Sequence, residues 1–299
     1  MKRTEFLSHD GKKISLVIWD DVSSPKGVLQ ISHGMAEHAM RYDSFAEILN
    51  EHGFIVCADD HRAHGETDGE TLGYSKGDIW ENTLADLDLI SKTLKQKYNL
   101  PLALFGHSYG SFLTQAYIQR YAENLSAVII GGSCRLKMSL VNPGKFVADV
   151  GCLFKGETAP AKMLAKMTFD DYNKKYSDGT TFISSIKSEC ERYKQDEKCD
   201  FVCSYNFYRS FFGGAKKLYK KSSAARLNKD LPVLLVAGDG DPVGYYGEGV
   251  KALAKFYKDS GVKSVDLKLY KGVRHEYLND VAREQVISDV IEFLEEKLK

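Results

Sequence analysis

Short apolar runs alternate with helical stretches over the first 133 residues of the chain. The runs are rich in β-branched residues and have the length of buried strands, which predicts strands at residues 14–19, 28–32, 54–58, 102–105 and 127–130. Apolar residues at helical spacing predict helices near residues 42–52, 84–98 and 110–121. Strands that alternate with helices in this way indicate an α/β fold, with a mostly parallel central sheet flanked by helices.

The alternation stops after residue 133 and returns at residue 231. The final part of the chain predicts a strand, a helix, a strand and a helix, at residues 231–237, 248–259, 264–270 and 280–298. Residues 134–230 are rich in aromatic residues and lysines and show helical rather than strand spacing. One helical stripe comprises Phe146, Val150, Leu153 and Phe154. We therefore expect an α/β core of residues 1–133 and 231–299, with residues 134–230 inserted as a helical cap.

Composition and charge exclude several classes of protein. The chain has 299 residues, of which 43% are hydrophobic, and this is ample for a substantial core. Its 41 basic residues balance 41 acidic ones, so it lacks the positive charge that a nucleic-acid partner requires. No apolar run approaches the roughly 18 residues of a membrane span, which predicts no integral membrane segment.

The six cysteines and the N-terminal residues indicate a reducing compartment. No CxxC pair occurs, and no histidine lies at metal-ligand spacing from Cys199 and Cys203. The basic residues near Met1 are not followed by the apolar stretch of a secretory signal. We expect reduced thiols and a cytoplasmic protein.

A candidate nucleophile lies where one predicted strand meets a helix. Gly106, Ser108 and Gly110 form Gly-x-Ser-x-Gly directly after the strand at residues 102–105. A serine on such a sharp turn sits in a strained backbone conformation, and small flanking residues avoid collisions with neighbouring elements. The helix that follows turns the positive end of its dipole toward any developing oxyanion. This context predicts that Ser108 is a nucleophile.

A serine hydroxyl needs a base and an acid that orients the base. His275 is the one histidine downstream of Ser108, and it follows the strand at residues 264–270. In this type of fold the acid lies between the serine and the histidine in the chain. Asp239 and Asp241 both follow the strand at residues 231–237. We prefer Asp241 as the acid and expect Asp239 to form the turn, although the roles could be reversed.

The loop after the strand at residues 28–32 is the candidate source of an oxyanion hole. The backbone N–H of Met35, next to the flexible Gly34, and the N–H of Tyr109 are the candidate donors. We expect His33 and His38 to shape this loop through hydrogen bonds rather than to react.

A second polar loop follows the strand at residues 54–58. It contains Asp60, His61, Arg62 and His64, a spacing that resembles a metal cluster. We interpret these residues instead as a buried hydrogen-bond network that braces the oxyanion loop. No metal and no cofactor is expected.

Taken together, the sequence resembles the monoacylglycerol lipase and lysophospholipase-like branch of the α/β-hydrolases over essentially its full length. The matching motifs are His33-Gly34-x-x-Glu37-His38, Asp60-His61-Arg62-x-His64-Gly65, Gly106-His107-Ser108-x-Gly110, Asp241-Pro242-Val243-Gly244 and Arg274-His275-Glu276. The resemblance implies the α/β-hydrolase fold and a triad of Ser108, Asp241 and His275. One departure is Ala63, where the family usually has glycine.

The triad and the aromatic cap predict a serine esterase or lipase that acts through an acyl-enzyme. The expected substrate is a small-molecule ester with an apolar acyl chain, such as a monoacylglycerol or a lysophospholipid. The cap aromatics either contact this chain or form the cap's own core. Two alternatives stay open: a peptidase of the proline-iminopeptidase type, and a non-catalytic binding protein. The peptidase would need acidic cap residues for a free amino terminus, and the candidates are Asp170, Asp171, Glu189 and Glu191. The oligomeric state is not predicted.

Overall fold

The fold is built on one eight-stranded sheet, seen in a computed structural model that describes residues 1–176 and 178–299, with residues 169 and 170 described by their backbone alone. The strand order is β1-β2-β4-β3-β5-β6-β7-β8. The strands are β1 (Lys2–Leu7), β2 (Lys13–Trp19), β3 (Gly27–Ser32), β4 (Phe54–Asp59), β5 (Leu102–His107), β6 (Ala127–Gly131), β7 (Val233–Gly238) and β8 (Val265–Tyr270). From β4 to β8 all neighbours are parallel, whereas β1 and β2 join antiparallel at one edge. The predicted fold class is confirmed.

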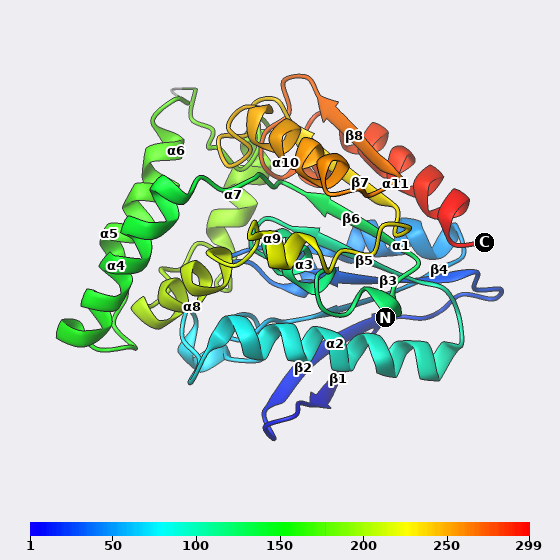
Figure 1. The fold of residues 1–299 in the computed structure, drawn as a ribbon, viewed down its shortest axis with the longest axis horizontal. Helices are drawn as coiled ribbons and strands as arrows, with labels where there is room; N and C mark the ends of the chain where they lie inside the picture. Colours follow the sequence, from blue (N-terminus) through cyan, green and yellow to red (C-terminus); the bar gives the residue numbers. More distant parts are fainter. Residues whose placement is uncertain (177) are drawn as a thin grey trace.

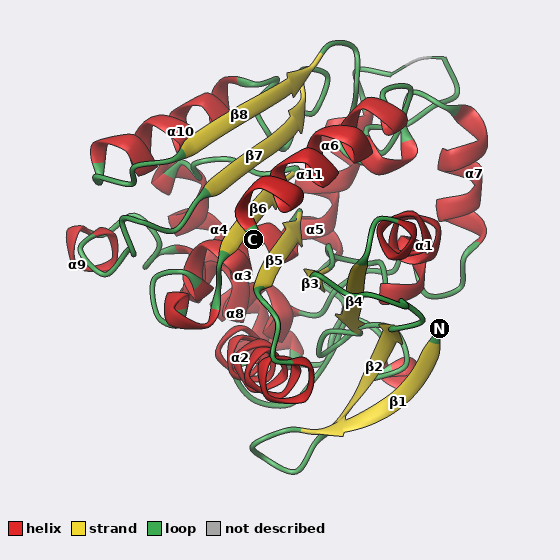
Figure 2. Ribbon diagram, turned by 90° about the vertical axis from the view of Figure 1, so that its right-hand side faces the viewer, coloured by secondary structure: helices red, strands yellow, loops and turns green. Residues whose placement is uncertain are grey.

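Helices cover both faces of the sheet because the central strands are apolar on both faces. Along β5, Leu102 and Leu104 pack on one side and Ala103 and Phe105 on the other. The first side is covered by α2 (Ile79–Tyr98), α3 (Tyr109–Tyr117) and α10 (Glu248–Asp259), and the second by α1 (Asp43–Glu51) and α11 (Arg283–Lys297). Figure 2 shows α11 in front of the central strands and α3 behind them.

Two elements differ most from the sequence prediction. The strand β1 was not predicted, because Lys2–Leu7 lies at the sheet edge, is largely exposed and lacks an apolar run. Helix α2 begins at Ile79, five residues before the predicted start at residue 84. The carboxylate of Asp78 accepts the N–H of Glu81 and so caps this first turn.

The segment between β6 and β7 contributes several helices, most of which lie at one end of the sheet, on the left of Figure 1. They are α4 (Met138–Lys155), α5 (Lys162–Ala165), α6 (Asp171–Asn173), α7 (Lys187–Gln195), α8 (Tyr205–Ala215) and α9 (Lys221–Ala224), with a π-helical turn at Lys166–Asp170. Helix α8 packs against both α4 and α2 and is largely buried. The division into a core and a cap at residues 134 and 230 stays a prediction.

The aromatic cap residues do not share one environment. Phe207 and Tyr208 of α8 are buried. By contrast, Phe146 and Phe154 of α4 are 69% and 78% exposed. The helical stripe predicted along α4 is therefore present, but it is not part of the cap's interior.

Two further observations concern the wider environment. Over the described residues, no helix is both long and apolar enough to cross a bilayer. All six cysteines are free thiols, and five of them are buried.

The backbone of Ala63 adopts a φ of +71°, a left-handed conformation that favours glycine. Its N–H donates to Asp68 at 2.7 Å and its carbonyl accepts the N–H of Gly73 at 2.8 Å, so the loop holds it in place. This strain explains why glycine suits the position.

We predict that Ala63→Gly raises the free energy of unfolding by about 1 kcal/mol, because it relieves the left-handed strain. Urea unfolding followed by circular dichroism measures the change. Ala46→Gly in helix α1 is a matched control, and it should destabilise the protein. A lower stability for Ala63→Gly would contradict the proposed strain.

Candidate active site

Ser108 lies in the sharp turn between β5 and α3. Its backbone has φ +51° and ψ −118°, and its N–H donates to the carbonyl of Gly131 on the neighbouring strand at 3.1 Å. The side chain is half-buried at the carboxyl end of the sheet. A non-glycine residue in this conformation is strained, and such strain is typical of functional turns.

The two glycines of the motif make this turn possible. A Cβ atom on Gly110 would lie 2.0 Å from the carbonyl oxygen of Ser32, and one on Gly106 would lie 2.2 Å from Oγ1 of Thr114. Neither position has room for a side chain. The glycines therefore let α3 approach strand β3 closely enough to present the hydroxyl of Ser108.

His275 and Asp241 meet Ser108 in the predicted order. Nε2 of His275 lies 2.8 Å from Oγ of Ser108, and Nδ1 lies 3.0 Å from Oδ2 of Asp241. A carboxylate only accepts hydrogen bonds, so Nδ1 carries the proton and Nε2 is free to accept one. Asp239 points elsewhere and accepts the N–H of Gly272 at 2.6 Å. The structure thus places Asp241, rather than Asp239, against the imidazole.

The surroundings of His275 favour its protonated form. Burial alone lowers the pKa of this imidazole, but the charge and hydrogen bond of Asp241 outweigh burial and raise the pKa above its ordinary value. Glu276 and Glu37 act in the same direction. This arrangement would stabilise an imidazolium if His275 took a proton from Ser108.

The predicted oxyanion loop lies directly against the serine. A Cβ atom on Gly34 would sit 2.5 Å from Oε1 of Glu37 and 3.1 Å from Cβ of Ser108, so a side chain here would require its neighbours to shift. Met35 and Tyr109 line the same cavity as Ser108 and His275. Their role as oxyanion donors stays a prediction.

Neutral histidines brace this loop. His33 contacts the carbonyl of Gly34 through Nδ1 at 2.8 Å and accepts the N–H of His61 through Nε2. His64 accepts the N–H of Ala36 at 3.1 Å. Burial lowers the pKa of His33 well below its ordinary value and that of His64 to about 3, so both are uncharged and can accept these hydrogen bonds.

The residues of the second polar loop point toward different partners and not toward one centre. Asp60 accepts the N–H of Ala39 at 2.9 Å, and His61 contacts Ser32 and Asp59. Arg62 binds a separate set of acceptors on the N-terminal hairpin and α2, namely Ser8, Asp10 and Asp86.

Within the described part of the chain, one group of potential metal ligands gathers: His38, Asp196 and Cys199. His38 lies 2.8 Å from the carboxylate of Asp196, and this hydrogen-bond contact joins the oxyanion loop to the segment after α7. We interpret the group as a contact between cap and core, in line with the expected role of His38.

An apolar cavity of about 330 Å³ opens on Ser108. Leu140, Val141 and Val147 come from α4, and Phe211 and Phe212 come from α8. Further lining residues are Phe112, Leu136, Leu164, Met167, Tyr172, Phe182, Ile183, Tyr193, Tyr208, Val243 and Tyr245. Helices from the segment between β6 and β7 therefore contribute an apolar wall beside the hydroxyl of Ser108.

The acidic cap residues considered for an amino terminus are not assembled at this cavity. Asp171, Glu189 and Glu191 are absent from its described lining, and Glu189 lies 2.6 Å from Arg192. The side chain of Asp170 lies outside the described residues.

Sequence reasoning missed two contacts around the base. The N–H of His275 donates to the carbonyl of Phe182 at 3.1 Å, so a cap segment supports the histidine loop. Arg41 binds both carboxylate oxygens of Glu276, the residue after His275. Arg41 and Glu276 lie 235 positions apart, so no local pattern in the sequence could have indicated this pair.

Comparisons with known proteins agree with this fold. The family described as serine aminopeptidase, S33, matches residues 23–282. A monoacylglycerol lipase from Mycolicibacterium smegmatis is 27% identical over 293 residues, covering 97% of this chain and 95% of the lipase. An uncharacterized abhydrolase domain-containing protein from Dictyostelium discoideum is 26% identical over 99% of this chain, which spans only 29% of that protein. A thermostable carboxyl esterase from Bacillus coagulans, solved with glycerol, is 28% identical with a TM-score of 0.88, covering 100% of this chain and 99% of the esterase.

We predict that the reactivity of Ser108 falls at acidic pH, with a midpoint above about 6.5, because only neutral His275 can accept the serine proton and its pKa is raised. Asp241→Asn removes the charge that raises this pKa. The midpoint of the labelling rate should then move to lower pH. At neutral pH the labelling rate itself should fall roughly 10⁴-fold. The rate of Ser108 labelling by a fluorophosphonate between pH 5 and 9 measures the midpoint. Asp239→Asn is the control, and an equal effect of the two substitutions would contradict the assignment.

Proposed function

The chain belongs to the serine aminopeptidase S33 family of α/β-hydrolases, and from this premise we propose that it hydrolyses carboxylic esters through an acyl-enzyme on Ser108. The proposed substrates carry an apolar acyl chain, as monoacylglycerols and lysophospholipids do. The single observation that carries the proposal is the apolar cavity that opens on the Ser108–His275–Asp241 array. Likeness to the lipase and the esterase named above supports ester hydrolysis.

In the proposed reaction, Oγ of Ser108 attacks the ester carbonyl while Nε2 of His275 takes the hydroxyl proton. Asp241 holds the imidazole and stabilises its positive charge. The tetrahedral intermediate collapses when its bond to the alcohol oxygen breaks, and His275 returns the proton to that oxygen. A water molecule then attacks the acyl-serine with the help of His275, and the carboxylic acid leaves with the serine hydroxyl restored.

Backbone N–H groups of Met35 and Tyr109 are the proposed donors to the oxyanion. Tyr109 is the first residue of α3, where the N–H groups have no partner within the helix and the dipole is positive. Each donor of this kind contributes on the order of 3 kcal/mol to transition-state stabilisation. The close packing of Gly34 on Ser108 supports the assignment of Met35.

The cavity wall favours an acyl chain over a charged amino terminus. Two acidic residues, Glu37 and Glu276, belong to its described lining, and both bind Arg41. A substrate amino group would therefore have to displace this arginine. Tyr208 and Phe211 of α8 line the cavity and are also buried, so they can both contact an acyl chain and contribute to the interior of the cap.

We predict that Ser108→Ala lowers the turnover of p-nitrophenyl esters by roughly six orders of magnitude, because the nucleophile is lost. The wild-type protein should prefer medium or long chains to acetate. A series from acetate to palmitate measures both effects. Ser139→Ala is the matched control, since Ser139 lines the same cavity without contacting His275. Wild-type inactivity toward every ester would favour a peptidase or a binding protein.

We also predict that Val147→Trp moves the preferred acyl length toward shorter chains, because the indole fills space between α4 and the serine. For the longest ester, kcat/KM should fall by about 10- to 100-fold, while acetate is little affected. The same ester series measures this change. An unaltered preference would show that the acyl chain lies elsewhere.

A further inference from the structure

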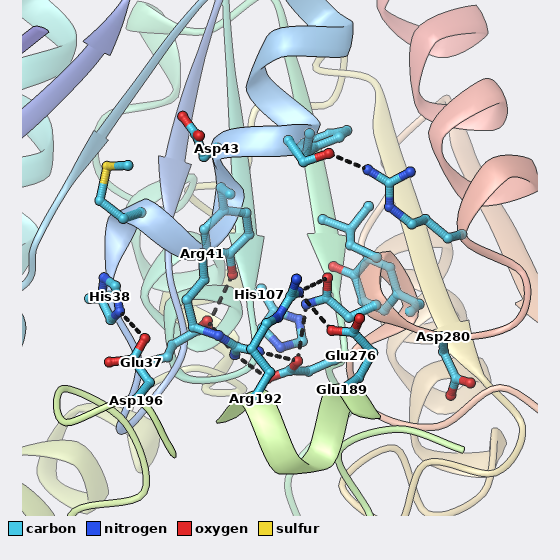
Figure 3. A pocket seen from close by; sticks show the side chains of 18 of the residues that line it. Glu37, His38, Arg41, Asp43, His107, Glu189, Arg192, Asp196, Glu276 and Asp280 are labelled. Atoms are coloured by element: carbon cyan, nitrogen blue, oxygen red, sulfur yellow. Dashed lines mark hydrogen bonds and ion pairs between the residues drawn. The ribbon is translucent and has the colours of Figure 1, made fainter. Parts of the chain in front are cut away.

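A buried chain of charged groups joins the two loops on which the proposed reaction depends. Arg41 lies at its centre, with Nη1 at 3.2 Å from Glu37 and Nη2 at 2.7 Å from Glu276, and its Nη1 also binds Glu276. The three side chains are each no more than 7% exposed. Figure 3 shows this ionic bridge between the segment that follows β3 and the segment that follows β8.

One end of the ionic bridge holds the proposed oxyanion loop. The carboxylate of Glu37 accepts the backbone N–H of Gly34, the residue packed against Ser108, and also the hydroxyl of Tyr42 at 3.0 Å. Three donors, including Arg41, therefore fix the Glu37 side chain. The peptide that carries the N–H of Met35 directly follows this anchored residue.

The other end holds the base. Glu276 is covalently next to His275, and its own N–H donates to the carbonyl of Ile183 at 2.8 Å. Asn279 donates to its carboxylate at 3.1 Å. Burial raises the pKa of Glu276, but Arg41 outweighs burial and lowers the pKa below its ordinary value, so the group is a carboxylate.

The cap packs against the ionic bridge through Tyr193. The guanidinium of Arg41 lies 4.9 Å from the ring centre of Tyr193 on α7, and the hydroxyl of Tyr193 donates to the carbonyl of Ala36 at 2.9 Å. Electrostatic interactions are stronger in such a water-poor setting. An arginine that makes two hydrogen bonds to one carboxylate also fixes the orientation of that carboxylate, whereas the ammonium group of a lysine does not.

We propose that Arg41 is a positioning residue, whose guanidinium sets the distance between the oxyanion loop and the histidine loop around Ser108. The inference rests on the proposed function of this site. Arg41 need not touch the substrate. It acts by joining Gly34, through Glu37, to His275, through Glu276.

The charged groups around His275 make its pKa a test of the proposal. If Arg41 served only to fill space, its removal would not change this pKa. Asp241, Glu276 and Glu37 face the imidazole, together with Ser108 and the ring of His107. Glu37, Arg41 and Glu276 also line a second, polar cavity, to which the cap contributes three further charged groups: Glu189, Arg192 and Asp196. Arg41 offsets the negative charge of Glu37 and Glu276, so its removal should raise the pKa of His275.

The test compares two variants. Arg41→Lys keeps the positive charge but loses the bidentate guanidinium, and Arg41→Met loses both the charge and the guanidinium. Arg192→Met is the matched control, since Arg192 lines the same polar cavity and pairs with Glu189 outside the ionic bridge. For each variant, kcat and KM are measured on a p-nitrophenyl ester and corrected for the active fraction by fluorophosphonate titration. The pKa of His275 is measured by NMR of isotopically labelled histidine, with the signal assigned through His275→Gln.

We expect kcat to fall about 10-fold in Arg41→Lys and about 100-fold in Arg41→Met, since small misplacements of reacting groups have effects of this size. KM should stay within about threefold, and the control should match the wild type. The pKa of His275 should rise in Arg41→Met and stay unchanged in Arg41→Lys.

An Arg41→Met variant that folds and keeps kcat within about twofold of the wild type would overturn the proposal. A fall in kcat of Arg41→Met without any change in the pKa of His275 would also overturn the proposal, because it would indicate a structural disturbance that does not act through the charged groups of the ionic bridge. If Arg41→Met does not fold, kcat of Arg41→Lys and a lowered His275 pKa in Glu276→Gln decide the question. If the wild type hydrolyses no ester, the proposed function fails, while the NMR titration still tests the ionic bridge.

Discussion

The close approach of α3 to strand β3 is the constraint on which the site depends. Ser108 adopts its left-handed conformation because Gly106 and Gly110 leave no side chains between the turn and its neighbours. The serine hydroxyl is thereby held at the end of β5, near the middle of a sheet that is apolar on both faces. The other groups reach it from loops at the same end of the sheet. An α/β sheet keeps its sites at this end because the loops after parallel strands converge there.

Burial and charge then assign a task to each polar group around the serine. Asp241 is fully buried, and its negative charge orients His275 and raises the pKa of that imidazole. His33 and His64 are buried without such a partner and remain neutral, so they serve as hydrogen-bonding supports. The same residue type thus acts as a proposed base at one position and as a brace at the others. The difference arises from the neighbouring carboxylate.

The sequence predicted those features that local patterns determine. Apolar runs located the central strands, and Gly-x-Ser-x-Gly after a strand located Ser108 correctly at the turn into α3. The glycines beside Asp239 indicated a turn former and so favoured Asp241 as the acid, and the structure brings Asp241 to His275. Strand β1 escaped prediction because a polar edge strand has no apolar signature. The ionic bridge through Arg41 escaped because it joins residues 235 positions apart, and pairing over that distance leaves no local pattern.

The central claim is that Ser108 carries the acyl group during ester hydrolysis. The most direct measurement is rapid-quench kinetics on a p-nitrophenyl ester, followed by mass spectrometry of the quenched protein. The account predicts a burst of p-nitrophenol close to one equivalent per active site, with the acyl mass located on the peptide that contains Ser108. An acyl group on another residue, or turnover without any acyl-protein when deacylation is made rate-limiting, would contradict it.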